Sequence, residues 1–256
     1  MLIADSLYIR RSRCDRPRAR LVCVPYAGAG ASIFTGWPDL LPEDVELLAV
    51  QLPGREDRAR EPQVTDLDRL VKTVAHALRP YLGQPMALFG HCGGGLLAFE
   101  LAVELSRRFG VAPARLFVSA QAAPFLAPRN PAIHDLPPDD FRHELDRLDG
   151  APPEVLADDD LMAYLTSVLR ADFRLWETYP VRERPLLACP ITAFGGTDDP
   201  RTDPADLVAW KQQTTGDFRL AMIDGGHFFI NHRAREVADE IAADLTRAQT
   251  KVGDGQ

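Results

Sequence analysis

The stretch from Met86 to Phe99 constrains the fold of this chain more than any other. Its first residues, 86–89, have the composition of a buried strand and lead through Gly-His-Cys-Gly-Gly into a helical pattern. This is the G-x-S-x-G pattern of a nucleophile elbow, with cysteine at the serine position. The turn would hold the sulfur of Cys92 at a helix N-terminus, where backbone N–H groups favour a thiolate. We therefore predict an α/β fold with Cys92 as the nucleophile, the alternative being an inert buried cysteine.

Strand-like and helix-like segments alternate along most of the chain. Strands are expected at residues 21–24, 46–52, 86–89, 115–119, 190–194 and 218–223, and helices at 67–78, at 203–213 and near the C-terminus. This alternation predicts a mostly parallel sheet with right-handed crossovers and flanking helices. We expect residues 1–256 to form a single domain, in which residues 1–20 are a polar, arginine-rich arm without an assigned function.

The pattern changes between residues 124 and 180. Proline and aspartate accumulate there around two helical patterns, at 139–148 and 159–172, and no strand-like run separates them. This predicts an inserted, mobile helical lid over the carboxyl edge of the sheet. The apolar residues Leu165, Leu169, Phe173 and Trp176 recur at helical spacing, and we expect them either to line an acyl channel or to hold the lid to the core.

Two further residues complete a catalytic triad in the order expected for an elbow fold, which is nucleophile, acid, histidine. His227 follows the last predicted strand between glycines and an apolar run, which makes it the candidate base. Asp198 and Asp199 both follow the strand of the 190s. Asp199 is preferred because the following Pro200 favours a tight turn that could aim its carboxylate at His227, and Asp198 is kept as the alternative.

The loop at residues 25–32, which is rich in alanine and glycine, follows the first predicted parallel strand. It lacks the third glycine of a dinucleotide-binding motif, because position 33 is isoleucine. In an elbow fold this loop supplies the second N–H of the oxyanion hole. We assign that N–H to Ala27, with Tyr26 as the alternative donor and as part of the channel wall, and the first N–H to Gly93.

Composition excludes some other classes of function. The 256 residues carry a net charge of −8, which argues against nucleic acid as the main partner. The four cysteines show no metal-binding spacing, so no metal is expected. The first residues do not resemble a signal peptide and no apolar run approaches the length of a membrane span, so we expect a cytoplasmic protein that does not associate with membranes.

Several motifs recur here in the order of a known family. They are Pro25-Tyr-Ala-Gly-Ala-Gly, Gln51-Leu-Pro-Gly-Arg-Glu56, Gly90-His-Cys-Gly-Gly, Arg170-Ala-Asp-Phe173 with Glu177-Thr-Tyr179, Gly195-Gly-Thr-Asp-Asp-Pro200 and Gly225-Gly-His-Phe-Phe229. On these residues the chain resembles the type II thioesterases, stand-alone α/β-hydrolases that accompany polyketide synthases and nonribosomal peptide synthetases. The resemblance implies hydrolysis of acyl or aminoacyl thioesters from the phosphopantetheine arm of acyl or peptidyl carrier proteins. It implies no cofactor of the enzyme's own.

The chain departs from this family at the nucleophile, where the family usually has serine. An acyl-cysteine is itself a thioester, so its energy is close to that of the substrate and exchange with a second thiol is nearly reversible. The alternative function is therefore an acyl or aminoacyl transferase that shuttles groups between carrier proteins through Cys92. Hydrolysis remains the first expectation because the other motifs are those of editing enzymes. An ester hydrolase and a catalytically inactive binding protein are further alternatives.

Overall fold

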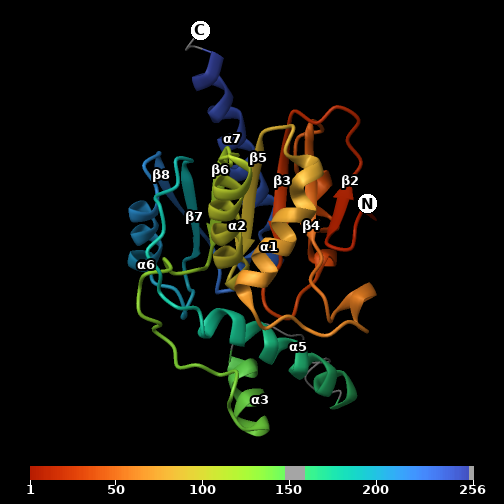
Figure 1. Ribbon diagram of the computed structural model, residues 1–256. Coiled ribbons are helices and arrows are strands. Elements are labelled where there is room, and N and C mark those ends of the chain that lie inside the picture. The colour runs from red at the N-terminus through yellow and green to blue at the C-terminus, as the bar shows by residue number, and fades with distance from the viewer. Residues whose placement is uncertain (148–158, 254–256) are drawn as a thin grey trace.

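The computed structural model describes residues 1–147 and 159–253, and a twisted sheet runs through its centre (Figure 1). In this part of the chain the sheet has the strand order β1-β2-β4-β3-β5-β6-β7-β8. The strands are β1 (Leu2–Ala4), β2 (Ile9–Ser12), β3 (Ala19–Val24), β4 (Val45–Val50), β5 (Met86–His91), β6 (Arg115–Ser119), β7 (Ile191–Gly196) and β8 (Phe218–Ile223). Strands β3 to β8 run parallel to one another. The mostly parallel α/β-hydrolase sheet predicted from the sequence is confirmed.

Helices cover both faces of this sheet. The α-helices of the described residues are α1 (Leu67–Leu78), α2 (Gly93–Phe109), α3 (Pro138–Arg147), α5 (Asp159–Glu177), α6 (Pro204–Val208) and α7 (Ala234–Gly253). Figure 1 shows α1 and α2 in front of the strands and α7 behind them. Helix α1 begins where the sequence predicts, because the side chain of Asp66 accepts a hydrogen bond from the Arg69 N–H and caps the first turn.

The central strands bury side chains on both faces. Along β3, Val22 and Val24 belong to the apolar cluster beneath α1 and α2, whereas Leu21 and Cys23 belong to the cluster beneath α7. Successive side chains of a strand point to opposite faces, so both sets are buried only if helices cover both sides. This is why the central strands are continuous apolar runs in the sequence.

The N-terminal segment differs from its prediction. Residues 1–20 were expected to form an arm, but β1 and β2 extend the sheet, with β2 antiparallel to β4. Ile9 is fully buried, and the neighbouring Arg10 and Arg11 form ion pairs with Asp57 and Glu46. The arginines that suggested a solvated arm are therefore paired along β2, which lies between the edge strand β1 and β4.

Helices α3 and α5 lie beyond the carboxyl ends of the strands (Figure 1). The helix predicted at 159–172 continues to Glu177, and the one predicted at 139–148 corresponds to α3. Residues 148–158 of the predicted lid lie outside the described residues. The two helices share a small apolar cluster that includes Phe141, Met162 and Phe173. The mobility of this region stays a prediction.

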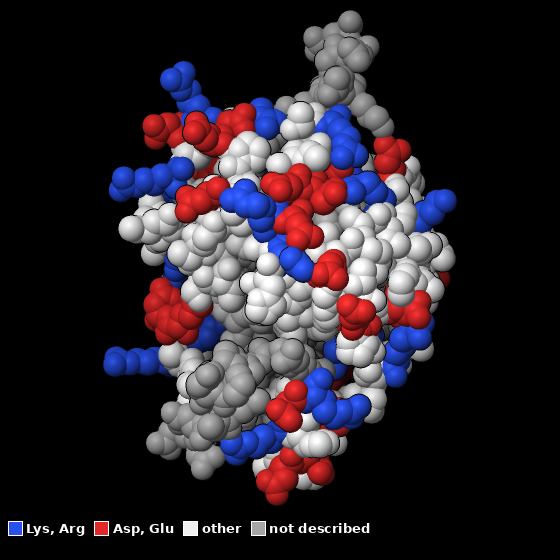
Figure 2. Space-filling model, turned by 180° about the vertical axis from the view of Figure 1, so that it is seen from behind, with Lys and Arg blue, Asp and Glu red and all other residues white. Residues whose placement is uncertain are grey.

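Acidic and basic side chains are interspersed on the face opposite to that of Figure 1, as Figure 2 shows. Among the described helices, none is long and apolar enough to cross a membrane. Within the same residues, no group of three or more His, Cys, Asp and Glu side chains is arranged to hold a metal ion.

Candidate active site

Cys92 occupies a strained turn between β5 and α2. Its backbone angles are φ 52° and ψ −134°, outside the regions that an L-residue normally adopts. Hydrogen bonds hold this conformation on both sides, since the Cys92 N–H donates to the Ser119 carbonyl at 2.8 Å and its own carbonyl accepts from the Gly95 N–H at 2.8 Å. Strain of this kind persists only where the surrounding structure fixes it, and it is common at functional sites.

The glycines of the turn are required by close backbone packing. A Cβ atom on Gly90 would lie 2.0 Å from the carbonyl oxygen of Gly94. On Gly94, a Cβ atom would lie 2.6 Å from the carbonyl oxygens of Val24 and Pro25. Because these neighbours are backbone atoms, neither can move aside without displacing β3, β5 or α2, and the sharp elbow needs glycine at both positions.

His227 lies beside Asp199 at the carboxyl ends of β7 and β8. The distance between His227 Nδ1 and Asp199 Oδ2 is 2.9 Å, and the Asp199 side chain is fully buried. The other carboxylate oxygen of Asp199 accepts a hydrogen bond from the Arg201 N–H at 2.8 Å. Asp198, the alternative from the sequence, is exposed and bonded to Thr197, so Asp199 is the aspartate that orients the histidine.

The second ring nitrogen of His227 faces the space that contains Cys92. With Nδ1 bonded to Asp199, Nε2 is buried and has no hydrogen-bond partner among the described residues. His227 and Cys92 line the same cavity. An imidazole with one nitrogen held by a carboxylate and the other free beside a thiol has the arrangement of a general base and its nucleophile.

Electrostatic interactions within the triad favour a thiolate–imidazolium pair. Burial alone would raise the pKa of the Cys92 thiol, but the charge of His227 and the backbone N–H of Gly93 outweigh it, and the pKa is lowered. Burial would likewise lower the pKa of His227, but Cys92 and Asp199 raise it to about 9. Burial would raise the pKa of Asp199, but the hydrogen bond to His227 and the charge of His227 outweigh burial, so the pKa of Asp199 is below its usual value.

The sequence predicts an oxyanion hole formed by the backbone N–H groups of Gly93 and Ala27. The N–H of Gly93, at the start of α2, already stabilises the negative charge on Cys92. In the loop after β3, the N–H of Gly28 donates to Asp172 and that of Ala29 donates to the Tyr26 carbonyl. The N–H of Ala27 has no hydrogen-bond partner among the residues that the structure describes, so it is free to receive a ligand oxygen.

A cavity of about 190 Å³ lies between Cys92 and α5. The loop at 120–131 forms one wall, and Phe173 and Trp176 form part of the other. The indole Nε1 of Trp176 is buried and has no hydrogen-bond partner within the described chain. Of the five residues predicted to line a channel, Phe173 and Trp176 line this cavity.

Three other predicted channel residues lie elsewhere. Leu165 and Leu169 are not among the lining residues; Leu169 packs against the apolar cluster of α3 and α5. The ring of Tyr26 packs edge-on against Phe228, and its hydroxyl donates to Asn231 at 3.1 Å. Tyr26 therefore supports the loop that carries His227, and a channel role for it, Leu165 and Leu169 stays a prediction.

Sequence reasoning gave no role to Arg55 and Asp172, which form a buried ion pair next to the oxyanion loop. Both belong to motifs noted in the sequence, Gln51–Glu56 and Arg170–Phe173. His91 directly precedes Cys92 and also had no assigned role. It is fully buried, its Nδ1 lies 2.9 Å from Ser119 Oγ, and its ring centroid lies 5.5 Å from that of His227.

Comparison with known proteins shows extensive similarity. Residues 19–245 match the family model of the Thioesterase domain. The chain is 39% identical over 228 residues to the gramicidin S biosynthesis protein GrsT of Aneurinibacillus migulanus, covering 89% of each chain. It is 37% identical over 245 residues to the thioesterase PikA5 of Streptomyces venezuelae, covering 95% of this chain and 87% of the relative.

Solved structures give the same result. The type II thioesterase BorB from the borrelidin biosynthetic cluster superposes with a TM-score of 0.86 at 36% identity, covering 95% of this chain and 99% of BorB. The thioesterase RedJ from the prodiginine pathway of Streptomyces coelicolor superposes with a TM-score of 0.82 at 39% identity, covering 91% of each chain.

Proposed function

Because the chain belongs to the Thioesterase family, we propose that it hydrolyses acyl or aminoacyl thioesters held on the phosphopantetheine arms of carrier proteins. The proposed route passes through an S-acyl intermediate on Cys92. GrsT is named for gramicidin S biosynthesis and BorB comes from the borrelidin biosynthetic cluster, which supports a carrier protein of a polyketide or nonribosomal peptide pathway as the partner. The observation that carries the proposal is the alignment of Asp199, His227 and Cys92 at the elbow.

Acylation begins from the thiolate–imidazolium pair. The Cys92 sulfur attacks the thioester carbonyl, and the carbonyl electrons move onto oxygen, which the N–H groups of Gly93 and Ala27 stabilise. When this intermediate collapses, the bond to the pantetheine sulfur breaks. The departing thiolate takes the proton from His227 Nε2, which leaves a neutral imidazole and an acyl-cysteine.

Deacylation uses the same groups in the opposite sense. Neutral His227, oriented by Asp199, accepts a proton from water while the water oxygen attacks the acyl carbon. Collapse of this second intermediate expels the Cys92 thiolate and releases the free acid. The imidazolium is thereby restored, so the enzyme returns to its starting state without a cofactor.

Acyl transfer to a second carrier protein is the competing outcome, and the presence of sulfur at position 92 is what favours it. A pantetheine thiol could replace water in deacylation, since an acyl-cysteine and an acyl-pantetheine are both thioesters. Water needs only a site beside His227, whereas transfer requires a second arm to enter the cavity after the first has left. We place hydrolysis first for this reason.

A two-carrier experiment separates the outcomes. One carrier protein is loaded with a labelled acyl group, and enzyme is added with an excess of a second, unloaded holo-carrier. We expect the label to appear as free acid. Rapid transfer of label to the second carrier, with free acid at the background rate, would replace the thioesterase assignment by an acyltransferase. The variant Cys92→Ser is the comparison, because an acyl-serine ester is a poorer donor to thiols.

A further inference from the structure

The oxyanion loop, residues 25–32, is held by side chains from outside it. It has no regular structure until the short 3-10 helix at Ala31–Phe34. Four of its residues nevertheless form backbone hydrogen bonds to side chains elsewhere: Gly28 N–H to Asp172 Oδ2 at 2.8 Å, Ala29 carbonyl from Arg55 at 3.2 Å, Ala31 N–H to Gln51 Oε1 at 2.8 Å, and Ser32 N–H to Glu56 Oε1 at 3.2 Å. The conformation of this loop therefore depends on groups distant in sequence.

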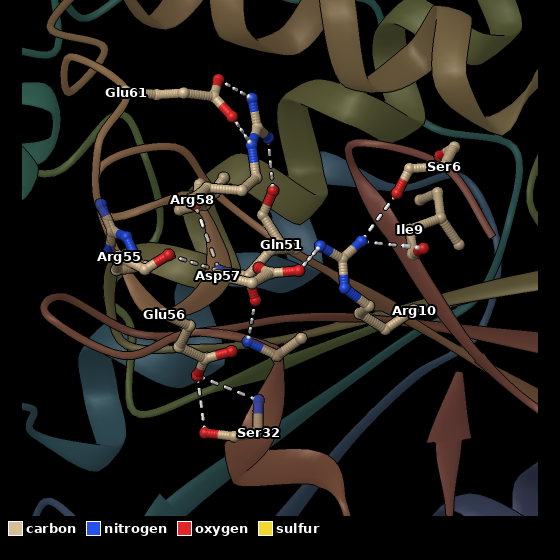
Figure 3. Close-up of polar contacts among 12 residues, drawn as sticks. Ser6, Ile9, Arg10, Ser32, Gln51, Arg55, Glu56, Asp57, Arg58 and Glu61 are labelled. Carbon is tan, nitrogen blue, oxygen red and sulfur yellow. Dashed lines mark hydrogen bonds and ion pairs between the residues drawn. The ribbon is translucent and has the colours of Figure 1, made fainter. Parts of the chain in front are cut away.

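Three of these groups come from the Gln51–Glu56 motif. Figure 3 shows Gln51, Arg55 and Glu56 on one turn of the chain, with the Glu56 carboxylate directed at Ser32. Glu56 also accepts from the Ser32 hydroxyl at 2.6 Å. The amide of Gln51 donates to the Arg55 carbonyl at 3.2 Å, which ties the motif to itself. The motif thus forms a rigid support for the outer half of the oxyanion loop.

The fourth group, Asp172, comes from helix α5. Its two oxygens accept from Arg55 at 2.5 and 2.8 Å, and both side chains are buried, with Asp172 only 1% exposed. A bidentate pair fixes the plane of the carboxylate. The oxygen that accepts from Gly28 is therefore held in place by Arg55, and a buried pair of this kind contributes to specific geometry more than to stability.

Helix α5 also approaches Gly28 closely. Gly28 has φ +79°, and a Cβ atom there would lie 2.6 Å from Leu169 Cδ2. Only glycine allows both this backbone conformation and this contact. Gly28 directly follows Ala27, so a shift of α5 at Asp172 would be transmitted to the N–H of Ala27.

We propose that Asp172 is a positioning residue that sets the oxyanion hole by holding the Gly28 N–H, with Arg55 fixing its carboxylate. This rests on the proposed function, in which the Ala27 N–H stabilises the oxyanion. It follows that the oxyanion hole is complete only when α5 is seated against the loop. The C-terminal half of α5 is then a fixed wall of the active site.

Two reactions of Cys92 distinguish a role of Asp172 in positioning the oxyanion hole from an effect of Asp172 on the stability of the whole protein. Alkylation by iodoacetamide occurs at a saturated carbon and forms no oxyanion, so it reports the thiolate alone. Cleavage of an acyl thioester of N-acetylcysteamine passes through an oxyanion, and its kcat/KM reports acylation. We expect Asp172→Asn to lower kcat/KM about 10- to 100-fold, because displacements near 1 Å at a reacting centre have effects of this size. The rate of Cys92 alkylation should stay within about twofold of wild type.

Asp244→Asn is the matched control. Asp244 is also a buried carboxylate in an ion pair, with Arg219 at 3.0 Å, but it lies at the opposite edge of the sheet. The Asp244→Asn substitution should lower the melting temperature without changing kcat/KM. If Asp172→Asn leaves Arg55 unpaired and does not fold, the double variant Arg55→Leu/Asp172→Leu removes both charges while leaving the Gly28 N–H without its acceptor, and the same loss is expected.

Three results would overturn the inference. Asp172→Asn and the double variant could retain wild-type kcat/KM, they could lower alkylation and thioester cleavage equally, or Asp244→Asn could lower kcat/KM to the same extent. Any of these would leave the proposed function intact. If the wild-type protein does not cleave the thioester at all, the proposed function fails and the inference fails with it.

Discussion

Buried polar groups have different surroundings at the two ends of the parallel strands, which are the amino edge, where the strands begin, and the carboxyl edge, where they end. At the amino edge, Asp244 on α7 accepts from Thr192 at 2.6 Å and pairs with Arg219, so its charge is compensated within the protein. Arg115 Nε, also at the amino edge, is buried without a hydrogen-bond partner in the part of the chain that the structure describes, but the same guanidinium pairs with Asp244 at 3.5 Å. At the carboxyl edge, His227 Nε2 and Trp176 Nε1 are buried without hydrogen-bond partners among the described residues, and both residues line the cavity. Leaving such groups unpaired costs free energy, so it is expected where a ligand will complete them. The comparison locates function at the carboxyl edge.

Two cysteines show the same contrast. Cys189 precedes β7 at the amino edge, and burial raises the pKa of its thiol to about 11. Cys92 follows β5 at the carboxyl edge, and burial acts on its thiol in the same direction, yet the pKa is lowered because His227 is adjacent. Burial is common to both sites. The adjacent charge of His227 is therefore what lowers the pKa of the Cys92 thiol and favours its thiolate.

The largest effect is expected from removing the nucleophile. Cys92→Ala should lower thioesterase turnover by at least about 1,000-fold, because it removes the sulfur that is proposed to carry the acyl group. Asp244→Asn, at the amino edge, should keep turnover and lower the melting temperature. Steady-state assays with calorimetry on both variants would test this, and substantial activity in Cys92→Ala would remove the distinction between the two edges.

The next effect concerns the triad acid. Asp199→Asn should lower turnover by about 100- to 10,000-fold, because the asparagine no longer stabilises the His227 imidazolium or its orientation. Asp198→Asn, an exposed neighbour in the same turn, should stay within about twofold. Equal and small losses in both variants would exclude a carboxylate from the catalytic apparatus.

The smallest effect is expected in the pH dependence of the alkylation rates of Cys92 and Cys189, which compares the two thiols directly. Only the thiolate reacts with iodoacetamide, and because the pKa of Cys92 is lowered, its thiol should be alkylated faster than that of Cys189 at about neutral pH. Cys189 should react only as the pH approaches about 11. In His227→Gln, burial would no longer be opposed by the imidazolium, and the Cys92 profile should move to higher pH. Peptide mapping of each cysteine gives the rates, and an unshifted profile would show that His227 does not activate the thiol.

The sequence predicted the parts of this molecule that depend on local pattern. The elbow, the alternation of strands and helices and the helix at 67–78 each follow from periodicity, glycine placement or capping over a few adjacent residues. Strands β1 and β2 were missed because both are short and β2 carries arginines. Those arginines are compensated by Asp57 and Glu46, and partners so distant cannot be identified from local pattern.

The site was predictable to a similar degree. Cys92, Asp199 and His227 follow strand ends, so the order of the sheet brings them together. Asp172 lies in the middle of a helix and acts on a loop 144 residues away, so neither its position nor its neighbours in the sequence indicate what it contacts. A buried ion pair between elements becomes visible only when the packing of α5 on the oxyanion loop is known.

The central claim is that Cys92 carries the acyl group, and trapping that intermediate tests it most directly. The protein is mixed briefly with an acyl thioester, quenched in acid, and the peptide containing Cys92 is examined by mass spectrometry. We expect a mass increase equal to the acyl group on Cys92 in the wild-type protein and none in Cys92→Ala. Acyl modification of a different residue during turnover, or continued turnover by Cys92→Ala, would contradict the account.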